Sequence, residues 1–126
     1  LGDVSGLQLN YEREGIKNTF WIVTAILDPA YGLQKEQIVE AARAYRMDIR
    51  PFFYPISSMQ PYQRYVQGKN MAAVNPVAYG IAPYGICLPS AMTITESEVA
   101  YVCDALKRIL ALVPAHSSVS ALHNRE

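Results

Sequence analysis

The stretch from Thr95 to Val113, "TESEVAYVCDALKRILALV", constrains the fold most strongly. Thr95 and Glu98 form a capping box, the side-chain pattern that begins many α-helices. One continuous apolar stripe follows at helical spacing, made of Val99, Val102, Cys103, Leu106, Ile109, Leu110 and Val113. A helix with such a stripe must bury it against another element, so this stretch predicts a second layer.

Three apolar runs supply candidate strands for that layer. "TFWIVTAILD", residues 19–28, is rich in β-branched and aromatic residues and predicts a central strand covered on both faces. "DIRPFFY", residues 48–54, predicts a second strand, which must lie at an edge or break at Pro51, because proline cannot donate to a ladder. "YGICLP", residues 84–89, predicts a short third strand that proline ends.

Between these runs the sequence predicts further helical segments. Residues 34–45 place Ile38, Ala41, Ala42 and Tyr45 on one helical face, although Gln34 is a weak cap. Residues 55–75 predict a loop with a short helix near residues 62–67, and the Asn-Pro pair at residue 75 begins one or two helical turns up to residue 83.

The order of these segments predicts an α+β two-layer sandwich, a small sheet with helices on one side. At 126 residues the chain has the length of a single domain. We expect residues 1–18 to be a lead-in segment, residues 19–112 to form the domain, and residues 113–126 to be a flexible tail, because that tail lacks periodicity.

Composition excludes several classes of protein. The 11 Lys and Arg balance the 11 Asp and Glu, which leaves no basic stripe for nucleic acid. The apolar runs are shorter than the ~20 residues that span a membrane, and no signal-peptide pattern begins the chain. The two cysteines, Cys87 and Cys103, lie in apolar runs without metal-ligand spacing, which favours buried free thiols over a disulfide and a cytoplasmic location.

The sequence contains no complete catalytic apparatus. Its only histidines, His116 and His123, lie in the tail, which argues against a nucleophile triad and against a metal site. Lysine can form Schiff bases, so each of the four lysines matters: Lys17, Lys35, Lys69 and Lys107. Each occupies a position typical of a solvated lysine, and none has the apolar surroundings that would lower its pKa.

"RPFFYPISSMQPY", Arg50 to Tyr62, is the remaining unusual stretch. For any single aromatic residue in this stretch, a role in core packing is favoured over a role in binding by about two to one. As a cluster, the stretch suits a nucleotide or sugar phosphate, because an arginine can bind a phosphate or carboxylate bidentately while tyrosines offer flat faces and hydroxyls. Ser57 and Ser58 add short hydrogen-bond donors.

Several elements together resemble the C-terminal part of the DegT/DnrJ/StrS family of nucleotide-sugar aminotransferases, closest to its perosamine synthase-like branch. They are "W-x-V-T" in the first strand, "I-R-P-F-F-Y-P" in the second, "G-I-C-L-P-S" in the third and the capped helix after it. The resemblance covers about residues 8–112. It implies the small domain of a fold-type-I aminotransferase, which depends on pyridoxal phosphate (PLP).

The resemblance also implies where function would lie. In this family the large N-terminal domain carries the PLP lysine, and nothing in this chain matches it, so no cofactor is expected in this chain. The positions expected to line a nucleotide-sugar cleft are Arg50, Phe52, Phe53, Tyr54, Ser57 and Ser58, with Tyr84 a weaker candidate.

Two interpretations of the whole chain follow from this resemblance. The first is an isolated small domain, inactive by itself. The second is a free-standing nucleotide-sugar-binding or assembly module that has lost its catalytic partner. In either case an exposed apolar face predicts a homo-oligomer.

Overall fold

The computed structural model describes residues 1–112. Its centre is a sheet in the order β1-β2-β4-β3, in which every neighbouring pair is antiparallel. The strands are β1 (Leu7–Leu9), β2 (Val23–Leu27), β3 (Arg50–Pro51) and β4 (Gly85–Leu88). The short edge strand β3 ends at Pro51, as the missing donor of proline predicts.

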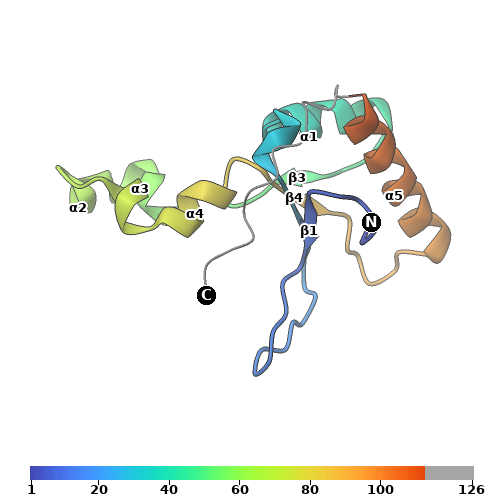
Figure 1. The fold of residues 1–126 in the computed structure, drawn as a ribbon, viewed down its shortest axis with the longest axis horizontal. Coiled ribbons are helices and arrows are strands. Elements are labelled where there is room, and N and C mark those ends of the chain that lie inside the picture. Colours follow the sequence, from blue (N-terminus) through green and yellow to red (C-terminus); the bar gives the residue numbers. More distant parts are fainter. Residues whose placement is uncertain (113–126) are drawn as a thin grey trace.

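Two helices, α1 (Lys35–Ala44) and α5 (Glu96–Ala111), cover one face of this sheet (Figure 1). The core lies between the two layers and consists of Ala25, Leu27, Ile38, Ala42, Met47, Ile49, Ile86, Leu88, Val102, Ala105, Leu106, Ile109 and Leu110. Five of these side chains come from α5, and four of them, Val102, Leu106, Ile109 and Leu110, belong to the predicted apolar stripe. Ala105 was not predicted, and Val99, which was, is exposed. The predicted two-layer α+β class is therefore observed.

The prediction that the first strand is covered on both faces was wrong. Ala25 and Leu27 of β2 are buried, whereas Thr24 and Ile26, which point to the opposite face, are only half-buried. The strand is central, between β1 and β4. Within residues 1–112, α1 and α5 lie over one of its faces (Figure 1). Its near-continuous apolar sequence had suggested full burial.

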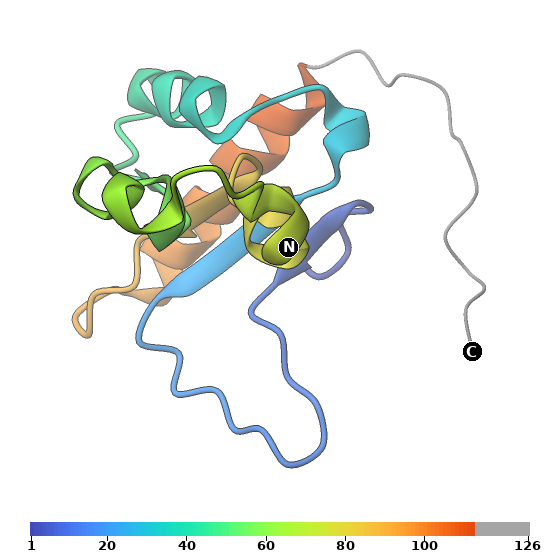
Figure 2. The same ribbon diagram turned by 90° about the vertical axis from the view of Figure 1, so that its left-hand side faces the viewer.

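Strand β1 was not predicted from the sequence. It is three residues long and gains its structure from pairing with β2, where Leu7 lies opposite Leu27. Beyond the end of this ladder, the Asn10 side chain takes the place of a strand partner: it accepts from Thr24 N and donates to Ile22 O, both at 2.8 Å. The loop between β1 and β2 extends away from the sheet (Figure 2).

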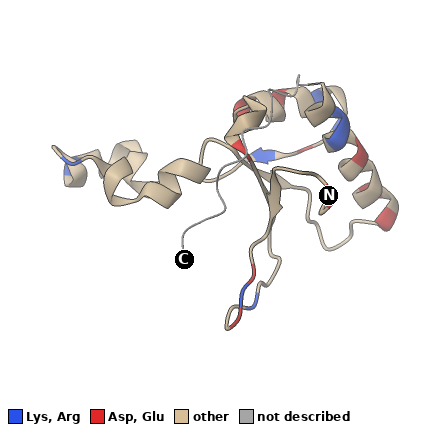
Figure 3. Ribbon diagram, viewed as in Figure 1, with Lys and Arg blue, Asp and Glu red and all other residues tan. Residues whose placement is uncertain are grey.

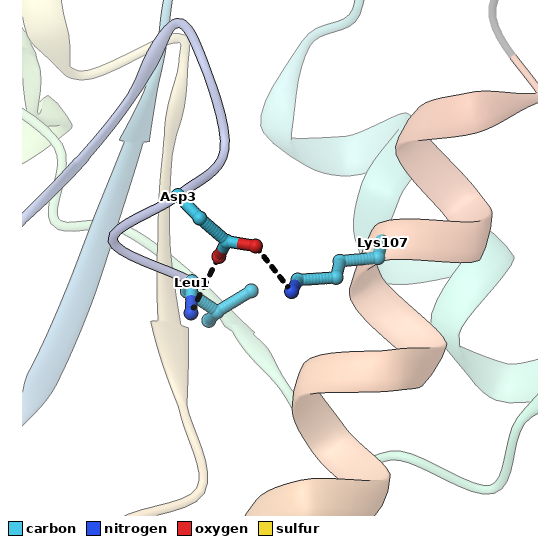
Figure 4. Close-up of polar contacts among 3 residues, drawn as sticks. All are labelled: Leu1, Asp3 and Lys107. Carbon is cyan, nitrogen blue, oxygen red and sulfur yellow. Dashed lines mark hydrogen bonds and ion pairs between the residues drawn. The ribbon is translucent and has the colours of Figure 1, made fainter.

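The start of the chain is tied to α5 by charge. Lys107 Nζ lies 2.8 Å from Asp3 Oδ2, and the amino group of Leu1 lies 3.4 Å from Asp3 Oδ1 (Figure 4). The hydrogen bond from Lys107 is the main reason that the pKa of the Asp3 carboxyl falls to about 2. Contacts of this exposed kind are screened by salt.

Residues 56–82 form a helical arm that extends from the sheet on the side away from α5 (Figures 1 and 2). It contains two short 3₁₀ turns, Ile56–Ser58 and Gln60–Tyr62, followed by α2 (Gln63–Val66), α3 (Met71–Val74) and α4 (Pro76–Ile81). The sequence predicted α2 and α4 but not α3. No helix within residues 1–112 is long and apolar enough to cross a membrane. The predicted flexible tail lies outside the described residues.

Candidate functional site

The clearest candidate site is a hollow of about 530 Å³ between the end of β3 and the arm. We call it the aromatic hollow. It is lined by Phe52, Phe53, Tyr54, Pro55, Ile56, Ser57, Asn75, Ala78 and Ile81. Four of the sequence-predicted site residues thus come together here, joined by three residues at the start and along α4 that the sequence did not indicate. An apolar cavity with a few polar groups is the usual form of a small-molecule site.

Strand pairing and one glycine position the first wall of the hollow. Phe52 N donates to Gly85 O at 2.9 Å, which extends the β3–β4 pairing by one residue. A Cβ at Gly85 would lie 2.6 Å from Phe52 Cβ, so only glycine lets the Phe52 side chain pack this closely over β4. Phe53 then meets Phe52 edge to face, with ring centroids 5.8 Å apart.

The two predicted serines have different surroundings. Ser57 Oγ shares a hydrogen bond of 3.0 Å with Tyr79 OH, which connects the hollow's lining to α4. Ser58 Oγ donates to Pro55 O at 2.7 Å and lines two neighbouring hollows instead of the aromatic one. Ser57 is thus the predicted serine that lines the aromatic hollow. Ser58 shares one of the neighbouring hollows with Tyr54.

Two predicted residues lie apart from the aromatic hollow. Arg50 is exposed on β3, opposite Cys87 in the register, with its guanidinium 3.9 Å from the Asp48 carboxylate. Tyr84 is partly buried and packs against the core. Neither residue lines the aromatic hollow, so their roles in ligand binding stay predictions.

Lys35 corrects the sequence analysis, which had assigned every lysine a solvated position. Its side chain is 2% exposed, and it is the largest fully buried residue of the described chain. Its Nζ donates to Phe52 O at 3.0 Å and lies 3.5 Å from the centroid of the Tyr54 ring. Burial lowers the pKa of the Lys35 ammonium, while the charge of Glu36 opposes that shift.

The sequence did carry a signal for Lys35. It lies three residues before Ile38 and seven before Ala42, so helical spacing places it on the buried face of α1. Its burial also depends on residues 52–54, which are distant in the chain and fold over it. Such a cover cannot be derived from the spacing within α1.

Tyr54 links the aromatic hollow to the start of α1. Its hydroxyl donates to Glu36 Oε1 at 3.1 Å, while its ring covers the Lys35 ammonium. The hydrogen bond to Glu36, followed by the charge of that carboxylate, raises the pKa of the Tyr54 phenol. Glu36 therefore has a specific contact as well as its favourable place in the first turn of α1.

Within the described residues, the cysteines and acidic side chains form no metal-binding cluster. Cys87 and Cys103 are free, as predicted, but half-buried instead of buried. Burial raises the pKa of the Cys87 thiol, which disfavours its reactive thiolate form. Among residues 1–112, no cluster of three or more His, Cys, Asp and Glu side chains could hold a metal ion.

Comparison with known proteins identifies the family. The profile of the DegT/DnrJ/EryC1/StrS aminotransferase family matches residues 1–107. The chain belongs to this family. The resemblance that the sequence motifs indicated is thereby confirmed.

Similar proteins include two sugar-modifying enzymes. The chain is 23% identical to GDP-perosamine synthase of Vibrio cholerae over 101 residues, and 25% identical to GDP-perosamine synthase of Escherichia coli O157:H7 over 100 residues. These matches cover 80% and 79% of this chain but only 26% and 25% of the enzymes. This member of the DegT/DnrJ/EryC1/StrS family thus spans about a quarter of the length of its curated relatives.

A solved structure confirms the fold. A putative sugar aminotransferase from Streptococcus pneumoniae, in its PMP form, superposes with a TM-score of 0.71 at 16% identity. The superposition covers 87% of this chain and 27% of that one. At this level of identity the likeness supports the architecture alone.

Proposed function

We propose that this chain is the small domain of a PLP-dependent nucleotide-sugar aminotransferase and contacts the sugar nucleotide through the aromatic hollow. The complete enzyme would transfer an amino group from glutamate to a keto-sugar nucleotide. The observation that carries this proposal is the family match over residues 1–107. The names of two relatives, both GDP-perosamine synthases, suggest a GDP-linked sugar as the substrate class.

The chemistry of the hollow suits such a ligand. Phe53 and Tyr54 are 60% and 55% exposed and offer flat faces on which a base or sugar can stack. Ser57, already paired with Tyr79, and Asn75 add hydroxyl and amide groups at the rim. The hollow could bind the substrate even if amino transfer takes place elsewhere in the complete enzyme.

We expect the chain to be inactive by itself. Lys35 is its one deeply buried lysine within the described residues, but its Nζ is enclosed by Phe52 O and the Tyr54 ring. An amine held in this way is poorly placed to attack the PLP aldehyde. Mixing the 126-residue chain with PLP should therefore leave the absorbance spectrum of free PLP unchanged, and adding glutamate and a keto-sugar nucleotide should yield no amino sugar.

A second candidate is a free-standing nucleotide-sugar-binding module. It is favoured by one observation: two separate segments of the chain, residues 52–57 and 75–81, come together in the fold to line the aromatic hollow. Titration of the ¹⁵N-labelled chain with GDP-mannose, followed by NMR, distinguishes the candidates. Weak binding with shifts confined to residues 52–57 and α4 supports the small-domain proposal, whereas tight stoichiometric binding supports the module. Absence of any shift at the hollow would contradict both.

A further inference from the structure

A single buried cation joins the two aromatic residues at the entrance of the aromatic hollow. The Lys35 ammonium donates to the carbonyl of Phe52 at 3.0 Å and lies 3.5 Å from the Tyr54 ring centroid. Hydrogen bonds from charged donors are stronger than neutral ones. A cation this near a ring centroid lies well within the range of a cation–π interaction.

We propose that Lys35 is a positioning residue that holds the Phe52–Tyr54 wall of the aromatic hollow in its ligand-binding arrangement. The proposal rests on the ligand-binding function assigned to the hollow above. Lys35 does not line the aromatic hollow, although its two contacts, Phe52 and Tyr54, do. It lines a neighbouring hollow of about 280 Å³ that Tyr54 also lines. We therefore expect Lys35 to act on a ligand in the aromatic hollow through Phe52 and Tyr54.

The Phe52–Tyr54 wall needs a contact outside the sheet to hold it, because the pairing of β3 with β4 ends at Phe52. Strand β3 stops at Pro51, and Phe52 N makes the last bond to β4, through Gly85 O. After that the chain turns away toward the arm, and Phe53 and Tyr54 become exposed. Lys35 contacts the chain at Phe52, where the pairing with β4 ends, and at Tyr54, two residues later.

The backbone of Lys35 is itself held by a helix and a hydrogen bond. Lys35 is the first residue of α1, and its backbone N–H donates to Pro83 O at 2.8 Å. Pro83 follows α4, which forms the opposite wall of the hollow. One residue thus connects the start of α1, the Phe52–Tyr54 wall and the end of the arm.

An apolar side chain at this position would avoid the free energy of burying a charge. Unlike an apolar side chain, the Lys35 ammonium can donate a hydrogen bond to the Phe52 carbonyl and make a cation–π contact with the Tyr54 ring. Two other ionisable groups lie close enough to the Lys35 ammonium to influence its charge. They are the Glu36 carboxylate, which also accepts a hydrogen bond from the Tyr54 hydroxyl, and the Cys87 thiol. The negative charge of Glu36 favours a charged Lys35.

The test replaces Lys35 by methionine, which keeps the length of the side chain and removes its charge. Lys35→Arg restores a cationic donor that can also stack on the ring. Lys17→Met is the matched control, since Lys17 is exposed in the loop between β1 and β2. The readout is the carbonyl ¹³C signal of phenylalanine in specifically labelled protein, which gives three signals for Phe20, Phe52 and Phe53.

We expect Lys35→Met to move the Phe52 carbonyl signal upfield and to broaden the ring signals of Tyr54, while the Phe20 signal and the methyl signals of the core stay in place. Lys35→Arg should restore both, and Lys17→Met should change neither. A Phe52 carbonyl signal that is unaltered by Lys35→Met overturns the proposal, since it would show that the amine does not hold this carbonyl.

Ligand affinity provides the second readout and separates the two proposals. If GDP-mannose binds the native chain, Lys35→Met should weaken binding by about tenfold, and Lys35→Arg should recover most of that loss. Unchanged affinity in Lys35→Met would overturn the positioning role. If the native chain binds no GDP sugar, the proposed function of the hollow fails, whereas the carbonyl signal still decides whether Lys35 holds the wall.

Discussion

At the scale of single residues, Gly85 sets the distance between β4 and the aromatic hollow. A Cβ here would lie 2.6 Å from Phe52 Cβ and 2.8 Å from Ile26 Cδ1. We predict that Gly85→Ala lowers the free energy of unfolding by about 1–3 kcal/mol, because overpacking forces neighbouring side chains to move. Urea denaturation followed by circular dichroism measures this change.

Gly80 provides the matched control for that substitution. It lies in α4, and a Cβ built there would meet nothing within 4 Å. Gly80→Ala should therefore be neutral or stabilise the chain by about 0.5 kcal/mol, through the higher helix propensity of alanine. Equal effects of the two substitutions would show that crowding by Phe52 does not explain the requirement for glycine.

The candidate site was partly predictable at this scale. The aromatic cluster of residues 52–54 was visible as composition, and four of the seven predicted site residues line one hollow. Lys35 was misassigned, although its spacing from Ile38 pointed inward, because a charged side chain is almost never fully buried without a partner. Its partners, Phe52 O and the Tyr54 ring, are contacts that only the tertiary fold creates.

At the scale of elements, the capping box of α5 is the feature whose energetics are most accessible to measurement. Thr95 N donates to Glu98 Oε2 at 2.8 Å, and Glu98 N donates to Thr95 Oγ1 at 3.3 Å, as the sequence predicted. We predict that Thr95→Ala lowers the free energy of unfolding by about 1 kcal/mol at neutral pH. Thermal or urea denaturation measures the loss.

This cap also predicts a dependence on pH. The backbone hydrogen bond from Thr95 lowers the pKa of the Glu98 carboxyl below its ordinary value of 4.5. Its stabilising contribution is therefore complete above pH 4.5 and is lost as the pH falls through the lower folded pKa. Glu98→Gln, which keeps an acceptor but cannot titrate, should flatten this part of the stability profile; an unchanged profile would contradict the assignment.

The elements differ in how far the sequence determined them. Helices α1 and α5 and strand β4 carry their own periodicity or end signals, and they occur near their predicted positions. Strand β1 has three residues and no such pattern, and it exists because β2 offers a paired edge. Gln34, predicted to be a weak helix cap, forms a capping box with Gln37, whose side chain accepts from Gln34 N at 2.8 Å.

At the scale of the whole molecule, the distribution of apolar surface is uneven. The arm, residues 56–82, contains only two charged residues, Arg64 and Lys69, whereas charges gather on the loop between β1 and β2 and on α1 and α5 (Figure 3). Its exposed apolar side chains include Ile56, Met59, Tyr62, Tyr65, Val74 and Val77. A surface of this kind is typical of a protein interface.

From this surface we propose that the 126-residue chain self-associates through the arm. The formal net charge of zero offers no general repulsion between copies. In sedimentation velocity experiments the weight-average sedimentation coefficient should rise with protein concentration. Replacing Val74 and Val77, which are 62% and 73% exposed, by lysine should remove that rise, because it places two charges on the apolar surface of each copy.

Met92→Lys is the control for the double substitution, since Met92 is fully exposed in the segment before α5 and away from the arm. It adds one surface charge without changing the arm, so self-association should persist. A sedimentation coefficient of the native chain that is independent of concentration would contradict self-association altogether. A concentration dependence that survives Val74→Lys/Val77→Lys would place the interface elsewhere. The two variants thus test the location of the contact, whereas the native chain tests its existence.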